Sequence, residues 1–330
     1  MATCNTMCPQ SEMEFRSKNH LISQLEATTS TSKGPKSKYV ADPKKMVKEY
    51  SRSAADTHKS MEPHLLRPYP VLLQTVEYLL ELYRPFKGEK EAVATRSFSS
   101  IFSFLTDRLR SVRQDMCIQN LRGNASVVLI EKMLPFYIET DALCKLSSCS
   151  NYDRKLHSVQ LEECFGRWYE ELSLCVSISP DPAIAACFYL RQLHRNSTLL
   201  HDLYVFRRRL PLKTFEIIRD IISTFNSRNY HRFFIQLETL DPLLVYALTD
   251  SISTLRQSAM RTISIAFKTP SAKLSTKSLS GWLGFSPDSE TFRTFLQMFS
   301  VIPDDCGNIL VCAIKPFEIP EDDFTSRMFK

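Results

Sequence analysis

The chain has 330 residues, 43% of them hydrophobic, and a formal net charge of +6 at pH 7. It is longer than a single minimal hydrophobic core requires, so one or two domains are expected. Because only 7 residues are glycine, the chain has few sites for tight hairpins, which argues against an all-β fold. The mild positive charge allows an acidic partner but does not require one.

The cysteines and the N-terminal residues indicate a reducing compartment. The ten cysteines have no paired spacing and fall mostly in apolar helical patterns. Cys4 and Cys8 are four apart, with His20 as the nearest further ligand; zinc needs four donors, so no metal ion or cofactor is expected. The sequence shows neither a signal peptide nor a run of roughly 18 apolar residues. We expect an intracellular protein, in the cytoplasm, the nucleus or both, without membrane contact.

The residues up to 62 are predicted to form an extended basic arm. Apolar positions at helical spacing indicate a short helix over 12–27, and the polar residues 28–38 are typical of a flexible linker. The arm leads into Arg-Pro-Tyr-Pro, where Pro70 fits the first turn of a helix because no N–H is needed there. Four later positions share one helix face and should dock on a larger body: Leu72, Val76, Leu79 and Tyr83.

The following two hundred residues have helical periodicity almost throughout. A helix over about 97–121 is expected to bury a stripe of five side chains: Ile101, Leu105, Leu109, Val112 and Met116. Asn124 can cap the next helix. Prolines separate the remaining predicted helices, which span 158–176, 181–193, 212–226, 230–237 and 242–267. Short helices joined by brief loops favour a curved, right-handed helical array.

The pattern changes after Pro270. A short helix is expected at 278–283, and Ser286 or Asp288 can cap a second one. Residues 301–302 and 309–313 then suggest a β-hairpin. Two helices and a hairpin after a long helix are in the order of a winged helix.

These patterns predict a mainly α fold, a helical array capped by a C-terminal winged helix with a small β-hairpin. Four segments are expected: an arm over 1–62, the array over 63–268, the winged helix over 269–316 and a tail over 317–330.

Four motifs follow one another along the chain: CNTMCPQSEMEFR at 4–16, VKEYSR at 47–52, LRPYPVLLQTVEYLL at 66–80 and DRLRSVRQDMCIQ at 107–119. In this order they resemble the signature of the suppressor-of-actin/GANP family, whose members are scaffold proteins in nuclear mRNA export. Ala2 and Thr6 stand where the family usually has glycine and aspartate. The resemblance covers roughly residues 1–315 and implies a PCI module, which is a TPR-like helical array ending in a winged helix.

In relatives of this family the module pairs with a second PCI-domain protein, which is braced by a small acidic peptide of the proteasome-lid type. The arm motifs and the length most resemble the short animal members built from this domain alone, which are associated with centrosome duplication and spindle progression. We therefore expect a non-catalytic scaffold with centrosomal or spindle partners. Two alternatives stay open: an mRNA-export subunit that contacts RNA, and a subunit of a lid-like assembly without nucleic-acid contact.

An enzyme is not expected. The sequence contains none of the nucleophile, phosphate-binding, zinc-protease or dinucleotide motifs GxSxG, GxxxxGK[ST], HExxH and GxGxxG.

The charged residues of the last two motifs are expected to form structural ion pairs, for example between Asp107 and Arg110 on one helix. Arg108 and Asp115 could bridge neighbouring helices. Contact with RNA or an acidic partner is the alternative for the arginines. The motif residues given a structural role are Arg67, Pro68, Pro70, Asp107, Arg108, Arg110, Arg113, Gln114 and Asp115.

Two basic stretches are candidate binding surfaces. Residues 251–280 carry five cations and no acidic side chain, and such a face can bind nucleic-acid phosphates without sequence specificity. Its candidate residues are Arg256, Arg261, Lys268, Lys273 and Lys277. The triple arginine, together with Lys213, could bind phosphate or an acidic peptide, or be an ordinary solvated surface. Its candidate residues are Arg207, Arg208 and Arg209.

An exposed apolar strip is expected to pair with a second PCI-domain protein. It would come from the predicted hairpin and the helix before it, through Phe292, Phe295, Phe299 and Ile309. Burial of all four within the chain would contradict this expectation.

Overall fold

The computed structural model describes residues 2–28, 39–51, 62–89, 95–146, 149, 151–175, 177–267, 269–286 and 289–314. The chain divides into two compact units. Unit 1 comprises Met1–Phe136 and Cys149–Ile178, and unit 2 comprises Tyr137–Ser148 and Ser179–Lys330. The predicted tail and most of the predicted linker lie outside the described residues.

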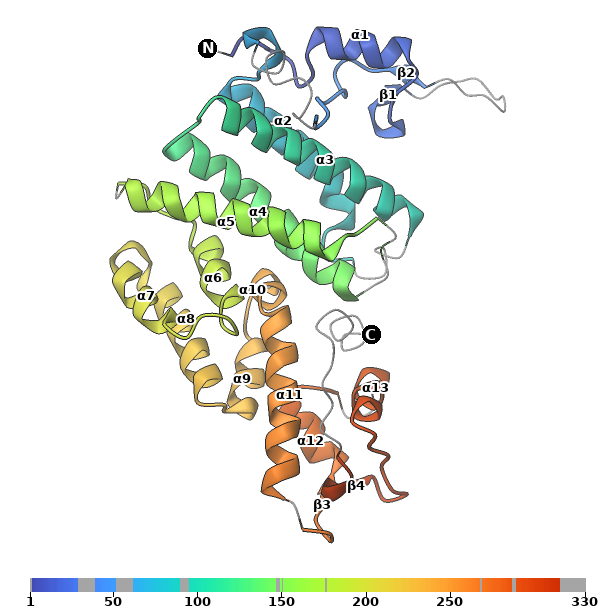
Figure 1. The fold of residues 1–330 in the computed structure, drawn as a ribbon, viewed down its shortest axis with the longest axis vertical. Helices are drawn as coiled ribbons and strands as arrows, with labels where there is room; N and C mark the ends of the chain where they lie inside the picture. Colours follow the sequence, from blue (N-terminus) through green and yellow to red (C-terminus); the bar gives the residue numbers. More distant parts are fainter. Residues whose placement is uncertain are drawn as a thin grey trace. The chain divides into compact units, whose positions relative to one another are not determined.

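Helices dominate both units, which confirms the mainly α prediction (Figure 1). The first five helices are α1 (Gln10–Lys18), α2 (Tyr69–Tyr83), α3 (Arg96–Ile118), α4 (Asn124–Leu146) and α5 (Arg154–Leu174). Four more are α6 (Pro182–Arg191), α7 (Leu199–Phe206), α8 (Leu212–Asn226) and α9 (Tyr230–Leu237). The last four are α10 (Pro242–Ala247), α11 (Thr249–Ala266), α12 (Thr276–Leu283) and α13 (Glu290–Met298). Two antiparallel pairs are described, β1 (Ala27–Thr28) with β2 (Val40–Ala41) and β3 (Lys273–Ser275) with β4 (Asn308–Leu310).

The helix faces predicted for α2 and α3 are confirmed. The N–H groups of Val71 and Leu72 bond to the carbonyl of Pro68, so Pro70 lies in the first turn of α2. The four predicted positions of α2 and the five of α3 are all buried. The Thr95 side chain caps α3 by accepting the N–H of Phe98 at 3.1 Å.

The arm is more structured than predicted. Its helix α1 ends at Lys18 instead of running to residue 27, and His20 follows with a φ of 55°. A 3-10 turn (Gln24–Glu26) follows, because its N-cap residue Ser23 and Glu26 form a reciprocal capping box. The arm also has an apolar cluster of its own, formed by Cys8, Met13 and Met46.

The helices of unit 2 follow the prediction with two differences. The predicted helices at 212–226 and 230–237 match α8 and α9. Helix α7 was not predicted. The single helix predicted over 242–267 is divided at Leu248, whose N–H bonds to the carbonyls of Leu244 and Val245 and closes α10.

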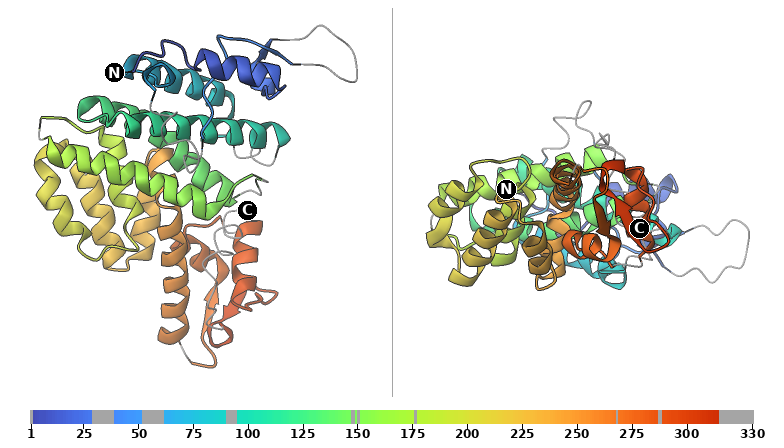
Figure 2. Two further views of the ribbon diagram at one scale, coloured as in Figure 1. Left: turned by 45° about the horizontal axis from the view of Figure 1, so that its top comes forward. Right: turned by 90° about the horizontal axis from the view of Figure 1, so that it is seen from below.

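The C-terminal part of unit 2 is a small layer of two helices and two strands beside α11 (Figure 2). The predicted hairpin is wrong: β4 pairs with β3, and residues 301–302 are not in a strand. The Asp304 carboxylate accepts the N–H groups of Cys306 and Asn308 and so forms a loop before β4. The winged-helix assignment stays a prediction.

Gly284 ends α12 in the left-handed conformation, with a φ of 65°. A Cβ atom at this position would lie 2.5 Å from Cδ1 of Phe234 on α9. Glycine therefore serves both the helix end and the close approach of α9.

Candidate functional site: buried ion pairs and exposed basic surfaces

Asp115 on α3 joins the arm to the start of α2. Its side chain is fully buried and accepts hydrogen bonds from Nε of Arg67 and Nζ of Lys48, both at 2.7 Å. Arg67 is fully buried as well, and its Nη2 donates to Oγ of Ser111 at 2.9 Å. A buried carboxylate with two cationic partners is costly to break, because removing it leaves both cations uncompensated.

Glu26 is the second centre of this network. It is fully buried and pairs with Arg16 and with Arg108, whose Nη2 lies 3.3 Å from Oε2. Its other oxygen accepts the N–H of Val47 at 3.0 Å. Arg108 also donates to Glu49 at 2.9 Å. Arg108 therefore joins α3 to two separate stretches of the arm, rather than to a neighbouring helix as predicted.

The other charged residues at the start of the last motif also have partners within unit 1. Asp107 pairs with Arg108 rather than with Arg110, and it accepts the N–H of Tyr50 at 3.3 Å. The Arg110 guanidinium lies over the Tyr50 ring, 3.9 Å from its centroid, which is cation–π geometry.

Further along α3, Arg113 pairs with Glu163 on α5. The Gln114 amide donates to the carbonyl of Ser51 at 2.8 Å. Every charged motif residue of α3 thus has an intramolecular partner, as the structural interpretation of this motif expects.

Burial also raises the pKa values of two side chains of the arm, Cys8 and Glu12. It raises the pKa of the Cys8 thiol far above its ordinary value, and the Glu12 carboxylate adds to the shift. Burial likewise raises the pKa of Glu12, against the opposing effect of the Glu49 N–H that it accepts. Cys8 is therefore a neutral thiol packed in the arm's apolar cluster.

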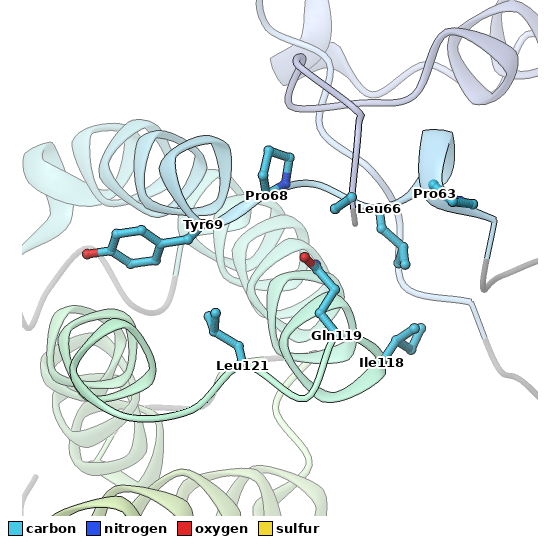
Figure 3. A pocket seen from close by; sticks show the side chains of 8 residues that line it. Pro63, Leu66, Pro68, Tyr69, Ile118, Gln119 and Leu121 are labelled. Atoms are coloured by element: carbon cyan, nitrogen blue, oxygen red, sulfur yellow. The ribbon is translucent and has the colours of Figure 1, made fainter. Parts of the chain in front are cut away.

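A pocket of about 610 Å³ lies between the start of α2 and the end of α3 (Figure 3). Its lining comes largely from the third and fourth motifs and carries no charged side chain: Ala2, Pro63, Leu66, Pro68, Tyr69, Ile118, Gln119 and Leu121. Such a lining favours an apolar ligand group over an ionic one.

Arg256, predicted to contact nucleic acid, is buried, so that assignment is corrected. Its Nε donates to the carbonyl of Leu283 at 2.9 Å and its Nη2 to that of Gly284 at 3.0 Å. The guanidinium lies 3.7 Å from the centroid of the Phe285 ring. Burial lowers the pKa of Arg256 to about 9. This arginine joins α11 to the end of α12.

Three other cations of that stretch are exposed: Arg261, Lys273 and Lys277. Nζ of Lys273 lies 3.0 Å from the Asp304 carboxylate, so one of the three is already paired within the chain. Lys268 lies outside the described residues.

The predicted apolar strip is contradicted. Phe292, Phe295, Phe299 and Ile309 are each 3% exposed or less. They form one core with residues of α11 and α12, among them Met260 and Leu283. They are buried because α13 and β4 direct these apolar side chains into the core of their own small subdomain.

The triple arginine forms a 3-10 turn between α7 and α8. Arg207 and Arg208 are exposed and Arg209 is half-buried. Arg207 lies over the Phe215 ring, 5.1 Å from its centroid, and Arg209 over the Phe206 ring at 5.0 Å.

Sequence reasoning missed the partners of the motif charges and a second buried cluster. Lys48 and Glu49 lie within a motif, which could have indicated them, whereas no local pattern indicates Glu26. In unit 2, Nζ of Lys145 lies 2.9 Å from Asp141 and 3.0 Å from Asp250. Burial opposes the charge of Asp250, but Lys145 outweighs it, so the pKa of Asp250 is lowered.

The structure adds three observations on chemistry. All ten cysteines are free thiols. Among the described residues, no group of three or more histidine, cysteine or acidic side chains could hold a metal ion. None of the helices in that same part of the chain is long and apolar enough to cross a membrane.

Comparison of the sequence with known proteins shows to which family the chain is similar. The model of the SAC3/GANP family matches residues 7–302. SAC3 family protein B of Arabidopsis thaliana is 31% identical over 42% of this chain and 7% of its own length. Protein xmas of Drosophila melanogaster is 23% identical over 96% of this chain and 15% of its own. SAC3 family protein 1 of Schizosaccharomyces pombe is 28% identical over 49% of this chain and 14% of its own.

The chain belongs to the SAC3/GANP family, because the family model covers most of it. The matched segments span 15% or less of each of these three relatives.

Proposed function

We propose that this chain is a non-catalytic scaffold of the SAC3/GANP family whose helical body binds partner proteins. The observation that carries the proposal is the use of the motif charges. Asp115 and Arg108 of the last motif, both buried, are occupied in joining α3 to Lys48 and Glu26 of the arm. The motifs thus build a fixed body, and binding falls to its exposed surfaces.

The proposed partners are a second PCI-domain protein, together with its small acidic lid-type peptide, and centrosomal or spindle proteins. The resemblance to short family members supports a role in centrosome duplication and spindle progression. Because Phe292 and its three apolar neighbours are buried, the pairing surface must use other residues than those predicted.

Affinity purification of the tagged full-length chain from cycling cells, with and without nuclease, tests this function. Nuclease-resistant recovery of centrosomal or spindle proteins without a second PCI-domain protein and its peptide supports the favoured role most directly. Recovery of a second PCI-domain protein with an acidic peptide instead indicates an export-type or lid-type assembly. If neither class is recovered above the level of an untagged control, the scaffold proposal fails.

An mRNA-export subunit that contacts RNA is the second candidate, supported by the exposed Arg261, Lys273 and Lys277. Since Lys273 already has Asp304 as a partner, about two free cations remain among the described residues of this stretch. Binding of single-stranded RNA should then weaken with salt with a log–log slope of about −1.4.

The salt dependence is measured by fluorescence anisotropy with a poly(U) oligonucleotide of roughly 20 residues. The double variant Arg261→Gln/Lys277→Gln should remove most of the slope. RNA binding that is absent, or that is unchanged in this variant, rejects the candidate surface.

A further inference from the structure

The turn between α7 and α8 combines exposed apolar and basic side chains in an unusual way. Three large apolar residues at this turn are substantially exposed: Tyr204 by 50%, Val205 by 73% and Leu212 by 62%. Arg207, Arg208 and Lys213 beside them are exposed as well. We call these six residues the α7–α8 corner; Figure 1 shows its two helices side by side.

The corner is held in place by the residues beneath it. Phe206 and Phe215 are buried, and the Tyr204 ring meets Phe215 edge-on with centroids 5.3 Å apart. The N–H of Leu210 bonds to the carbonyl of Arg207 at 3.2 Å and closes the turn. The exposed side chains therefore extend from a fixed backbone.

The corner keeps a net positive charge, since its three cations have one exposed carboxylate close by in sequence, Glu216, one turn after Lys213 on α8. Within the part of the chain that the structure describes, Arg207, Arg208 and Lys213 form no ion pair. Two acidic side chains near the corner are engaged elsewhere: Asp202 accepts the Asn196 amide at 3.1 Å, and Asp220 pairs with Arg219 at 2.7 Å. Helix α8 also begins without a side-chain cap, so its positive end adds to the same field.

We propose that the α7–α8 corner docks an acidic, amphipathic segment of a partner protein. Apolar side chains of the segment cover Val205 and Leu212, while its carboxylates pair with Arg207, Arg208 and Lys213. An apolar cluster with a charged rim is the arrangement expected of a protein interface. A nucleic-acid backbone would match the cations but would leave Val205 and Leu212 without a partner. The inference deepens the proposed scaffold role by giving one partner its chemistry.

A selection of peptides tests the composition of this partner directly. Random peptides of about 16 residues, long enough for four helical turns, are displayed on phage and selected on the full-length chain. The same library is selected in parallel on Arg207→Glu/Arg208→Glu. The wild-type chain should enrich peptides rich in Asp or Glu, with apolar residues at three- and four-residue spacing. The charge-reversal variant should lose them.

Synthetic versions of the enriched peptides are then measured by anisotropy on variants with intact folds. Affinity should fall at least about tenfold in Arg207→Glu/Arg208→Glu and in Val205→Ser/Leu212→Ser. The matched control, Arg232→Glu/Arg293→Glu, makes the same charge change at exposed positions of α9 and α13 and should bind as the wild type does.

Three results would overturn the proposal: no enrichment over an uncoated surface, enriched peptides without acidic character, or equal binding by the corner and control variants. Poly(U) binding that depends on Arg207 and Arg208 would assign the corner to nucleic acid instead. The scaffold role is tested separately by the affinity purification. Partner proteins can be recovered with the wild-type chain whether or not peptides bind to the α7–α8 corner, so failure of the corner proposal does not reject the scaffold proposal.

Discussion

Arg67 and Arg208 show two opposite uses of arginine within one chain. Arg67 in unit 1 is fully buried and bonds to Asp115 and Ser111. Arg208 in unit 2 is exposed and forms no ion pair among the described residues. Both precede a helix that follows a proline, α2 for Arg67 and α8 for Arg208, yet one fixes the body and the other is available to a partner. The most recognisable charges of the sequence are therefore structural, and the less distinctive ones are the candidates for binding.

Removing Asp115 should have the largest effect on stability of the changes that test this contrast. Asp115→Ala leaves Arg67 and Lys48 without their shared carboxylate and should lower the free energy of unfolding by about 3–5 kcal/mol. Chemical denaturation followed by circular dichroism measures it. Glu163→Ala, which removes the exposed partner of Arg113, is the control and should cost less than about 1 kcal/mol. Equal losses in the two variants would mean that the buried ion pairs of Asp115 stabilise the fold no more than the exposed pair of Glu163 does.

Glu26→Ala should release the arm more selectively. Arg16 and Arg108 lose a common partner and the N–H of Val47 loses its acceptor, at a cost of about 2–4 kcal/mol. Hydrogen exchange should show faster exchange at Val47, with the centre of α3 less affected. Exchange that is unchanged at Val47 would show that the arm is held by other contacts.

Arg256→Gln separates structure from binding within unit 2. The carbonyls of Leu283 and Gly284 lose their donor and the Phe285 ring loses its cationic neighbour, so the free energy of unfolding should fall by about 2–3 kcal/mol. The salt slope of any RNA binding should not change, because the side chain is buried. Thermal melting and anisotropy at several salt concentrations measure the two effects. A reduced salt slope of RNA binding, together with unchanged stability, would mean that Arg256 contacts RNA after all.

Arg208→Ala should have the smallest effect on folding. An exposed side chain without an ion pair usually changes stability by no more than about 0.5 kcal/mol. The melting temperature of this variant should match that of the wild type. A loss comparable to that of Arg256→Gln would mean that the α7–α8 corner is part of the folded body and not a free surface.

Local patterns predicted the helices far better than the contacts between them. Helix α8 begins directly after Pro211, and Asn229 caps the first turn of α9, so local residues predict where both helices start. The break at Leu248 was missed because apolar periodicity continues through it. Helix α7 was missed because it is as short as α9 but lacks a comparable start signal: its N-cap residue Thr198 forms no side-chain cap hydrogen bond.

The candidate sites depended on burial, which periodicity alone does not give. The apolar face of α13 was expected to bind a partner, but α11 and α12 of the same subdomain cover it. Arg256 was assigned to a basic surface because its neighbours in sequence are basic, whereas the carbonyls of Leu283 and Gly284 come from a later helix. The exposed apolar residues of the corner could not be predicted, because the sequence of an amphipathic helix does not show which of its apolar side chains remain exposed in the folded chain.

The ion pairs of the arm also impose an order on synthesis. Glu26, Lys48 and Arg67 emerge from the ribosome before Arg108 and Asp115, the α3 residues with which they pair. The nascent arm therefore carries its charges into solvent until about fifty further residues of chain have followed Arg67. Only then can they be buried, so the arm is secured after α3 has been made, although it precedes α3 in the chain.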